Sequence, residues 1–309
     1  MISVVFSFRN EEDVLEELVK RVSNVFVNMN REYELIFVND DSTDKSVEIL
    51  LKLRETNENI KIINMSRRFG VTPCVLAGFE SSKGEAVIYM DSDLQDPPEL
   101  IPQLIEKWQN GAEVVHTTRT KRDGESALKM FITKQAYKVI NFFSSIKLLE
   151  NTGDFKLLSR RVVNEILKLK ESDPYMRGMS TWVGFKQVQV FYEREARFAG
   201  ETKFGLFSSA NPYKEFVRGL TSFSSAPLYF ALFIGFFISI SSFAYLLIVI
   251  STKFLGMNLP GWSAIMAAIL FLGGTTLITI GVLGIYLGKI YEEIKGRPRY
   301  IIEDKIGFE

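Results

Sequence analysis

The chain has 309 residues, and its 37 Lys and Arg balance its 37 Asp and Glu, so no basic excess suggests a nucleic-acid partner. One cysteine, Cys74, excludes an internal disulfide framework and fits a reducing compartment. One histidine, His116, leaves little room for a histidine triad or a multi-histidine metal site. Carboxylates are therefore the main candidate ligands and acid–base groups.

The first two thirds of the chain alternate apolar runs with charged helical patterns. Short runs rich in β-branched residues predict strands over residues 2–8, 33–40, 60–66, 85–91 and 112–118. After the first strand, Asn10 is a candidate N-cap for an amphipathic helix. Pro97 and Pro98 begin another predicted helix, which ends near Gly111. Strands that alternate with helices predict an α/β fold with a doubly wound, mostly parallel sheet.

Polar residues follow three of the predicted strands, where ligands of such sheets bind. They are Asn10-Glu11, Asn39-Asp40-Asp41 and Asp91-Ser92-Asp93, and we expect them to meet at one edge. In an extended segment, the spacing of Asp91, Asp93 and Gln95 places three oxygens on one side, which suits Mg²⁺ or Mn²⁺. The alternative is a solvated acidic turn with Asp96 as a helix N-cap.

Two uncharged runs, residues 227–250 and 263–287, each exceed the roughly 20 residues that cross a bilayer. They predict a two-helix transmembrane hairpin rather than buried core helices. Cations cluster before the first run and after the second, which by the positive-inside bias places both flanks in the cytoplasm. The predicted parts are a cytoplasmic domain (1–210), a juxtamembrane amphipathic segment (211–225), two transmembrane helices (226–288) and a cytoplasmic tail (289–309).

Six motifs carry a family resemblance: "SFRNEE", "VNDDSTD", "SRRFG", "MDSDLQDPPELI", "GDFKLLSR" and "AGETKF". In order and spacing the chain resembles the inverting GT-A glycosyltransferases that load sugars onto polyprenyl phosphates. Over its first two thirds it resembles dolichol-phosphate mannose synthases. It is still more similar to the bacterial bactoprenol-phosphate glucosyltransferases of O-antigen modification, which share the two C-terminal membrane helices and a "GRPRYII"-like tail.

The resemblance implies inverting transfer of a hexose, with glucose from UDP-glucose as first choice, to undecaprenyl phosphate at the cytoplasmic face of a bacterial inner membrane. It also implies a Mg²⁺ or Mn²⁺ cofactor, coupling to a flippase, and contacts between membrane helices that could form a homo-oligomer. Three alternatives stay open. They are another sugar (mannose, N-acetylhexosamine or aminoarabinose), a polysaccharide synthase, whose Q-x-x-R-W motif the chain lacks, and a non-catalytic membrane scaffold.

The resemblance also assigns roles to individual residues. The predicted nucleoside contacts are Ser7, Arg9, Glu11 and Asp40. The predicted site for the metal and the donor diphosphate is Asp91, Asp93 and Gln95. The predicted phosphate or acceptor contacts are Arg119, Lys134, Arg160 and Lys203.

Asp154, in "GDFKLLSR", matches the residue usually proposed as catalytic base. A phosphate monoester has a second pKa of about 6, so the acceptor oxygen is already nucleophilic at neutral pH. Asp154 could therefore orient the sugar or the acceptor instead, or simply cap a turn after Gly153. The chain departs from the family pattern at Ser7, Arg9 and Asp41, where a proline, an aromatic residue and a glycine are usual. Asp41 is strained if its position needs a positive φ.

Overall fold

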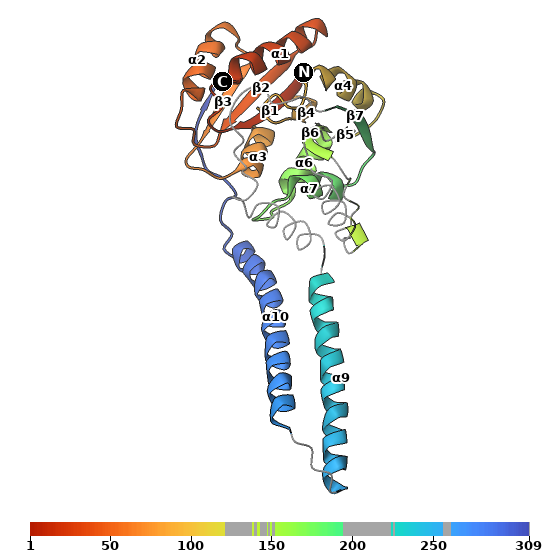
Figure 1. Ribbon diagram of the computed structural model, residues 1–309. Helices are drawn as coiled ribbons and strands as arrows, with labels where there is room; N and C mark the ends of the chain where they lie inside the picture. Colours follow the sequence, from red (N-terminus) through yellow and green to blue (C-terminus); the bar gives the residue numbers. More distant parts are fainter. Residues whose placement is uncertain are drawn as a thin grey trace.

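The computed structural model describes residues 1–120, 138, 141–142, 147, 149, 152–193, 224, 226–255 and 261–308. Figure 1 shows an α/β domain from which two long helices, α9 and α10, extend on one side. The domain contains an eight-stranded sheet with the order β7-β5-β6-β4-β1-β2-β3-β8. Its strands are β1 (Ile2–Phe8), β2 (Tyr33–Asn39), β3 (Ile60–Met65), β4 (Ala86–Tyr89), β5 (Val114–Arg119), β6 (Thr152–Ser159), β7 (Gln187–Tyr192) and β8 (Ile302–Ile306).

The sheet is mixed and mostly parallel, as predicted. Strand β1 pairs in parallel with β2 and β4, β2 with β3, and β5 with β7. Strand β6 runs antiparallel between β4 and β5, and β8 runs antiparallel on the edge strand β3. All five predicted strands are present, and β6, β7 and β8 are additional. Because β6 is reversed, its first residues lie beside the last residues of β4 and β5.

Helices cover both faces of the sheet, which explains why its central strands, β1, β2 and β4, are nearly continuous apolar runs. The main helical elements of the domain are α1 (Leu15–Asn28), α2 (Ser46–Thr56), α3 (Val71–Ser81), η1 (Pro98–Leu100), α4 (Ile101–Gln109), α6 (Arg160–Lys168) and α7 (Met176–Trp182). Along β1, Val4 and Phe6 belong to the apolar core under α1 and α4, whereas Val5 belongs to the core under α3, α6 and α7. This alternation is the two-residue period of a strand.

Asn10 does not cap α1. Helix α1 begins at Leu15, and Asn10 has a φ of 54° in the loop before it. Its side chain instead accepts a hydrogen bond from the Thr43 amide (2.8 Å), and its backbone N–H donates to Ser42 Oγ (3.1 Å). Asn10 therefore joins the loop after β1 to the loop after β2, because its amide side chain tolerates the left-handed backbone that this junction needs.

Within the described part of the chain, helices α9 (Ala226–Phe254) and α10 (Trp262–Ile294) are the two candidate membrane spans. By length and composition, Pro227–Thr252 and Phe271–Ile294 can each cross a membrane, and neither segment is buried in the protein. The helices contact each other, and α10 runs past the uncharged run to Ile294. Apart from Ser224, the predicted juxtamembrane segment 211–225 lies outside the described residues.

The chain returns to the domain after α10. The Ser172 amide donates to Glu293 Oε1 (2.8 Å), and the Arg299 guanidinium donates to the Leu169 carbonyl (2.6 Å). Strand β8 then pairs with β3 along Ile62–Ile306 and Asn64–Asp304. The C-terminal segment is thus part of the sheet, which the sequence-based division into domain and tail did not foresee.

Candidate active site

The ends of β1, β2 and β4 meet at one edge of the sheet, as expected. Phe8 lies opposite Asn39 in the parallel register, and the Asp40 amide donates to the Phe8 carbonyl (3.0 Å). The Arg9 Nε donates to the Asp41 carbonyl (3.3 Å), and Ser92 Oγ donates to the Ser7 carbonyl (3.4 Å). The three polar segments therefore form one surface beyond the strand ends.

The acidic segment after β4 is a turn and not an extended strand. Ser92 and Asp93 lie in the turn, and Leu94 has a φ of 56°. Asp93 Oδ1 accepts a hydrogen bond from the Gln95 amide (3.1 Å), which closes the turn locally. The expectation that Asp91, Asp93 and Gln95 share one side of an extended segment is therefore wrong. The place of Gln95 in a metal site rests on the family resemblance alone.

Asp91 is surrounded by other carboxylates. The Tyr89 hydroxyl donates to Asp91 Oδ1 (3.4 Å). Burial, followed by the charges of Asp154, Asp96 and Asp93, raises the pKa of Asp91 well above its ordinary value. Such crowding is unfavourable for the protein alone and is relieved by a cation.

The donor set fits a hard cation only in part. Among the residues that the structure describes, no group of three or more His, Cys, Asp or Glu is arranged to hold a metal ion. Asp91 and Asp93 offer two carboxylates, and Mg²⁺ or Mn²⁺ commonly binds one or two protein carboxylates and completes its shell with water and substrate phosphates. The two aspartates therefore fit an ion that arrives with a phosphorylated ligand.

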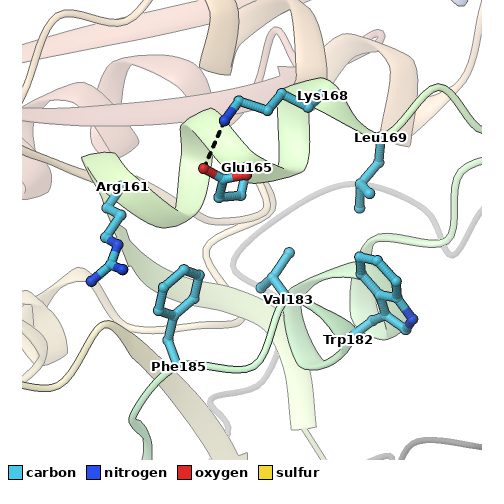
Figure 2. Close-up of a pocket in the computed structure, with 7 residues that line it drawn as sticks. All are labelled: Arg161, Glu165, Lys168, Leu169, Trp182, Val183 and Phe185. Carbon is cyan, nitrogen blue, oxygen red and sulfur yellow. Dashed lines mark hydrogen bonds and ion pairs between the residues drawn. The ribbon is translucent and has the colours of Figure 1, made fainter.

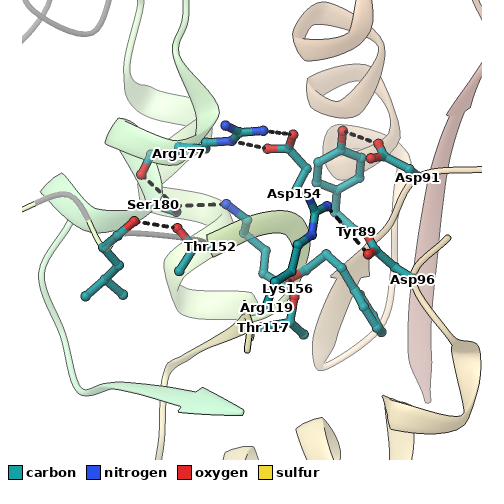
Figure 3. A network of polar contacts seen from close by, with 12 residues as sticks. Tyr89, Asp91, Asp96, Thr117, Arg119, Thr152, Asp154, Lys156, Arg177 and Ser180 are labelled. Atoms are coloured by element: carbon teal, nitrogen blue, oxygen red, sulfur yellow. Dashed lines mark hydrogen bonds and ion pairs between the residues drawn. The ribbon is translucent and has the colours of Figure 1, made fainter. Parts of the chain in front are cut away.

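Asp154 lies on β6 and is held by an arginine of α7. Arg177 Nε and Nη2 donate to Asp154 Oδ1 (3.1 Å) and Oδ2 (2.7 Å), a two-pronged contact. Figure 3 shows Asp154 between Arg177 and the Tyr89–Asp91 pair. Burial alone would raise the pKa of Asp154, but the Arg177 charge and its hydrogen bonds bring that pKa below its ordinary value. Asp154 is therefore a persistent negative charge with a fixed orientation.

Lys156 lies two residues further along β6, on the face that Asp154 occupies. Its side chain is 1% exposed, and its Nζ donates to Ser180 Oγ at 3.3 Å. Burial lowers the pKa of Lys156 to about 8, and the nearby Asp154 charge opposes that shift. This buried ammonium is a positive charge behind the acidic cluster.

Arg119, at the end of β5, belongs to the same cluster. Its Nη2 lies 3.5 Å from Asp96 Oδ1, and its Nε donates to the Tyr192 hydroxyl (3.1 Å), which in turn donates to Asp96. Asp96 is buried and lies before η1, whose N-cap is Pro97. Arg119 thus neutralises a buried carboxylate next to the candidate site, and contact with a ligand phosphate stays a prediction.

The predicted nucleoside contacts lie at the ends of β1 and β2. Asp40 is 5% exposed, and its carboxylate accepts hydrogen bonds from the Phe69 and Gly70 amides at 2.6–3.1 Å. Asp40 therefore orders the "SRRFG" segment in front of α3. Asp41 has a φ of 62°, so its position does need the left-handed backbone that glycine usually provides. Ser7 and Asp40 both contact the buried Cys74 thiol, whose pKa is raised by burial.

Arg160 does not belong to the site. It follows β6, whose last residue pairs with Ala86 at the amino-terminal end of β4. Its guanidinium donates to the Gly84 carbonyl (2.8 Å) and to Ser82 Oγ (3.0 Å). Because β6 is antiparallel, its motif has Asp154 at one edge of the sheet and Arg160 at the opposite edge. Lys134 and Lys203 lie outside the described residues.

A separate pocket of about 470 Å³ lies between α6 and the end of α7. Arg161 stacks on the Phe185 ring at 4.6 Å there, and Glu165 pairs with Lys168 (Figure 2). None of the carboxylates of the candidate active site lines this pocket.

Sequence reasoning missed Arg177, Lys156 and Tyr89. Lys156 had a usable signal, because it is two residues from Asp154 in one strand and so shares its face. Arg177 lies 23 residues from Asp154 in a short helix, and nothing in its local pattern indicates this pairing.

Comparison with known proteins gives a consistent result. The model of "Glycosyl transferase family 2" matches residues 3–167. An uncharacterized glycosyltransferase of Synechocystis sp. is 44% identical over 309 residues, which cover 100% of this chain and 96% of that protein. The bactoprenol glucosyl transferase of Shigella phage SfII is 41% identical over 303 residues, 98% of this chain and 97% of that protein.

Among solved structures, glucosyl-3-phosphoglycerate synthase from Mycobacterium tuberculosis aligns with a TM-score of 0.48 and 18% identity, over 72% of this chain and 79% of that one. The family match and the sheet order confirm the predicted GT-A-type fold, and the full-length relatives confirm the resemblance to bactoprenol glucosyltransferases. With its family match over more than half of its length and relatives above 40% identity along nearly all of it, the chain belongs to glycosyl transferase family 2.

Proposed function

We propose that this transferase moves glucose from UDP-glucose to undecaprenyl phosphate, with inversion at the anomeric carbon. The observation that carries the proposal is the cluster of Asp91, Asp93 and Asp154 at the strand ends of a domain that continues into two apolar helices. A cluster of carboxylates suits a metal and a nucleotide diphosphate, and an adjoining hydrophobic hairpin suits an acceptor that lives in the membrane. Near-full-length similarity to bactoprenol glucosyl transferases supports this choice of sugar and lipid.

The nucleotide half of the donor binds beyond β1 and β2, near Ser7, Arg9, Glu11 and Asp40. Asp91 and Asp93 would hold Mg²⁺ or Mn²⁺ beside the donor diphosphate, and a bound ion would supply charge neutralisation for the departing nucleotide diphosphate. The raised pKa of Asp91 supports this, because a carboxylate crowded by three others gains stability from a cation.

Asp154 acts by the position of its charge. Arg177 keeps it ionised and oriented, and the lowered pKa makes it a weak proton acceptor. The acceptor phosphate has its second pKa at about 6 and needs no strong base. Asp154 therefore orients the sugar or the acceptor and stabilises positive charge at the anomeric carbon during transfer.

The fold supports a position of the active site and the C-terminal segment on the same side of the membrane. Strand β8 follows α10 and pairs with β3, so the domain and the C-terminal segment lie on the same side of any membrane that the helices cross. The excess of cations beside both helices supports the cytoplasmic face. Homo-oligomer formation and coupling to a flippase stay predictions from the family.

The test is transfer of radiolabelled sugar into lipid. Membranes with the wild-type chain, undecaprenyl phosphate and Mg²⁺ or Mn²⁺ are supplied with UDP-glucose, UDP-N-acetylglucosamine, GDP-mannose or UDP-4-amino-4-deoxy-L-arabinose. We expect a labelled, acid-labile glucolipid from UDP-glucose alone, and none from Asp93→Asn. A lipid product from another donor would show that the transferred sugar is not glucose. A polymeric product would indicate a polysaccharide synthase, and no product from any donor would favour a non-catalytic scaffold.

A further inference from the structure

A chain of hydrogen bonds connects the C-terminal strand β8 to the turn that follows β2. The Ser42 amide donates to Asn39 Oδ1 (2.9 Å), and Asn39 Nδ2 donates to Asn64 Oδ1 (3.0 Å). Asn64 Nδ2 then donates to Asp304 Oδ1 (2.7 Å). Every donor in this relay points toward β8, and the last acceptor is a carboxylate, an arrangement in which successive hydrogen bonds polarise one another.

The relay follows the pairing of three strands. Asn39 lies opposite Asn64 in the parallel β2–β3 register, and Asn64 lies opposite Asp304 in the antiparallel β3–β8 register. Directly opposed residues on one face of a sheet have side chains within contact distance. The three side chains are therefore aligned across the sheet by the backbone itself.

The turn at the near end of the relay contains one predicted nucleoside contact, Asp40, and holds a second, Arg9, by a hydrogen bond. Asp41 holds a left-handed backbone at a φ of 62°, which a non-glycine residue keeps only when its surroundings fix it. The Asn39–Ser42 hydrogen bond spans this turn. Asp40 lies within the turn, and the Asp41 carbonyl accepts from Arg9 Nε (3.3 Å). A substitution at Asn39 would therefore change the positions of both Asp40 and Arg9.

A backbone contact also connects the "SRRFG" segment, between β3 and α3, to the same C-terminal segment. The Ser66 amide donates to the Ile301 carbonyl (3.0 Å). Ser66 begins the "SRRFG" segment, whose Phe69 and Gly70 amides bind the Asp40 carboxylate. Both the turn that contains Asp40 and the segment whose amides donate to the Asp40 carboxylate thus depend on residues that follow α10.

We propose that β8 is a structural part of the donor pocket, and that Asp304 is a positioning residue for the nucleotide half of the donor through Asn64 and Asn39. This rests on the proposed function, which places the nucleotide beyond β1 and β2. Since the chain reaches β8 only after both apolar helices, the pocket reaches its final geometry only when the helical hairpin has returned the chain to the sheet. Membrane anchoring and donor binding are coupled in this way.

The test uses the full-length protein in lipid nanodiscs, with Asp304→Ala, Asp304→Asn and Glu303→Ala. Glu303→Ala is the matched control, because it removes the same charge from the neighbouring exposed residue of β8, for which the described part of the chain shows no hydrogen bond or ion pair. We expect Asp304→Ala to raise KM for UDP-glucose about 3- to 10-fold, the range for loss of one hydrogen bond, with kcat and KM for undecaprenyl phosphate unchanged. Asp304→Asn keeps an acceptor oxygen and should stay within about twofold of wild type, a rescue that a charge effect does not give.

Amide hydrogen exchange without ligand tests the relay separately. Residues 39–43 should exchange faster in Asp304→Ala and at the wild-type rate in Glu303→Ala. Faster exchange with an unchanged donor KM would overturn the positioning role and leave the glucosyltransferase function in place. Equal losses of kcat and KM in Asp304→Ala and Glu303→Ala would show general damage to β8 and would also overturn it. A wild-type protein that transfers no sugar refutes the proposed function and the donor pocket with it.

Discussion

Replacement of Arg177 by alanine separates the two roles open to Asp154, because the roles predict opposite changes in rate. Arg177 both orients the Asp154 carboxylate, through contacts of 3.1 and 2.7 Å, and lowers its pKa. If Asp154 were a general base, loss of Arg177 would raise that pKa and strengthen the base. If Asp154 acts by a fixed charge, the same change would release the carboxylate and slow transfer.

The structure sets the size of the expected effect. The Arg177 and Asp154 side chains are 36% and 24% exposed, so the pair is only partly screened by water. Hydrogen bonds to charged groups contribute about 1.5–3 kcal/mol each. Partial exposure to water reduces the sum of the two bonds by about half, to roughly 1.5–3 kcal/mol for the pair. At about 1.4 kcal/mol per factor of ten, we expect kcat to fall by roughly 10- to 100-fold in Arg177→Ala.

The assay measures kcat and both KM values for Arg177→Ala, Arg177→Lys, Asp154→Asn and the double variant Arg177→Ala/Asp154→Asn. Lysine offers a point charge without the fork and should recover only part of the rate. The double variant should be no slower than Asp154→Asn, because the two residues act as one unit. Arg161→Ala is the matched control, since Arg161 lies on α6 beside Phe185, in the separate pocket. An Arg177→Ala protein that is folded and as fast as wild type, or faster, would refute the fixed-charge role.

Three further predictions can be checked independently. Asp93→Asn should remove transfer while melting temperature and membrane insertion stay unchanged; substantial activity that still requires Mg²⁺ or Mn²⁺ would place the ion elsewhere. Cysteines at Leu255 and Lys305 should react with an impermeant reagent from opposite sides of the membrane, and labelling of both from one side would contradict the hairpin. Burial holds the folded-state pKa of His116 at about 4 against its ordinary 6.5, so the unfolded chain takes up the proton first as pH falls. Stability should therefore decline from pH 6.5 to about 4, by about 3 kcal/mol from this group, and His116→Gln should flatten that part of the profile in thermal melts; equal pH profiles would count against it.

The sequence predicts those strands whose local residue pattern is typical of only one kind of element. Strands β1 to β5 are apolar runs covered on both faces, and their period and length are visible without tertiary information. Strand β8 has the sequence "IEDKI", whose charged residues are typical of an exposed edge strand and equally typical of a solvated tail. Only its pairing with β3 distinguishes the two, and that contact spans about 240 residues of sequence.

The candidate site shows the same limit. Convergence of the strand ends follows from parallel topology, and the motif residues Asp91, Asp93 and Asp154 do lie in one region. The turn between Asp91 and Gln95 could not be predicted, because Leu94 adopts a positive φ where no glycine or asparagine marks it. Nor could the motif "GDFKLLSR" show that Arg160 lies at the far edge of the sheet, since that depends on the antiparallel direction of β6.

The pairing of β8 with β3 constrains the membrane arrangement independently of the charges beside the helices. Hydrogen bonds between strands need a separation of about 5 Å, so β3 and β8 cannot lie on opposite sides of a bilayer core about 30 Å thick. Among the described residues, α9 and α10 are the candidate spans between the domain and β8, and two crossings would return the chain to the side on which it started. The positive-inside bias reaches the same arrangement from the flanking cations. The pairing of β3 and β8 leaves the choice of face open, and the cytoplasmic face stays a proposal that rests on the bias.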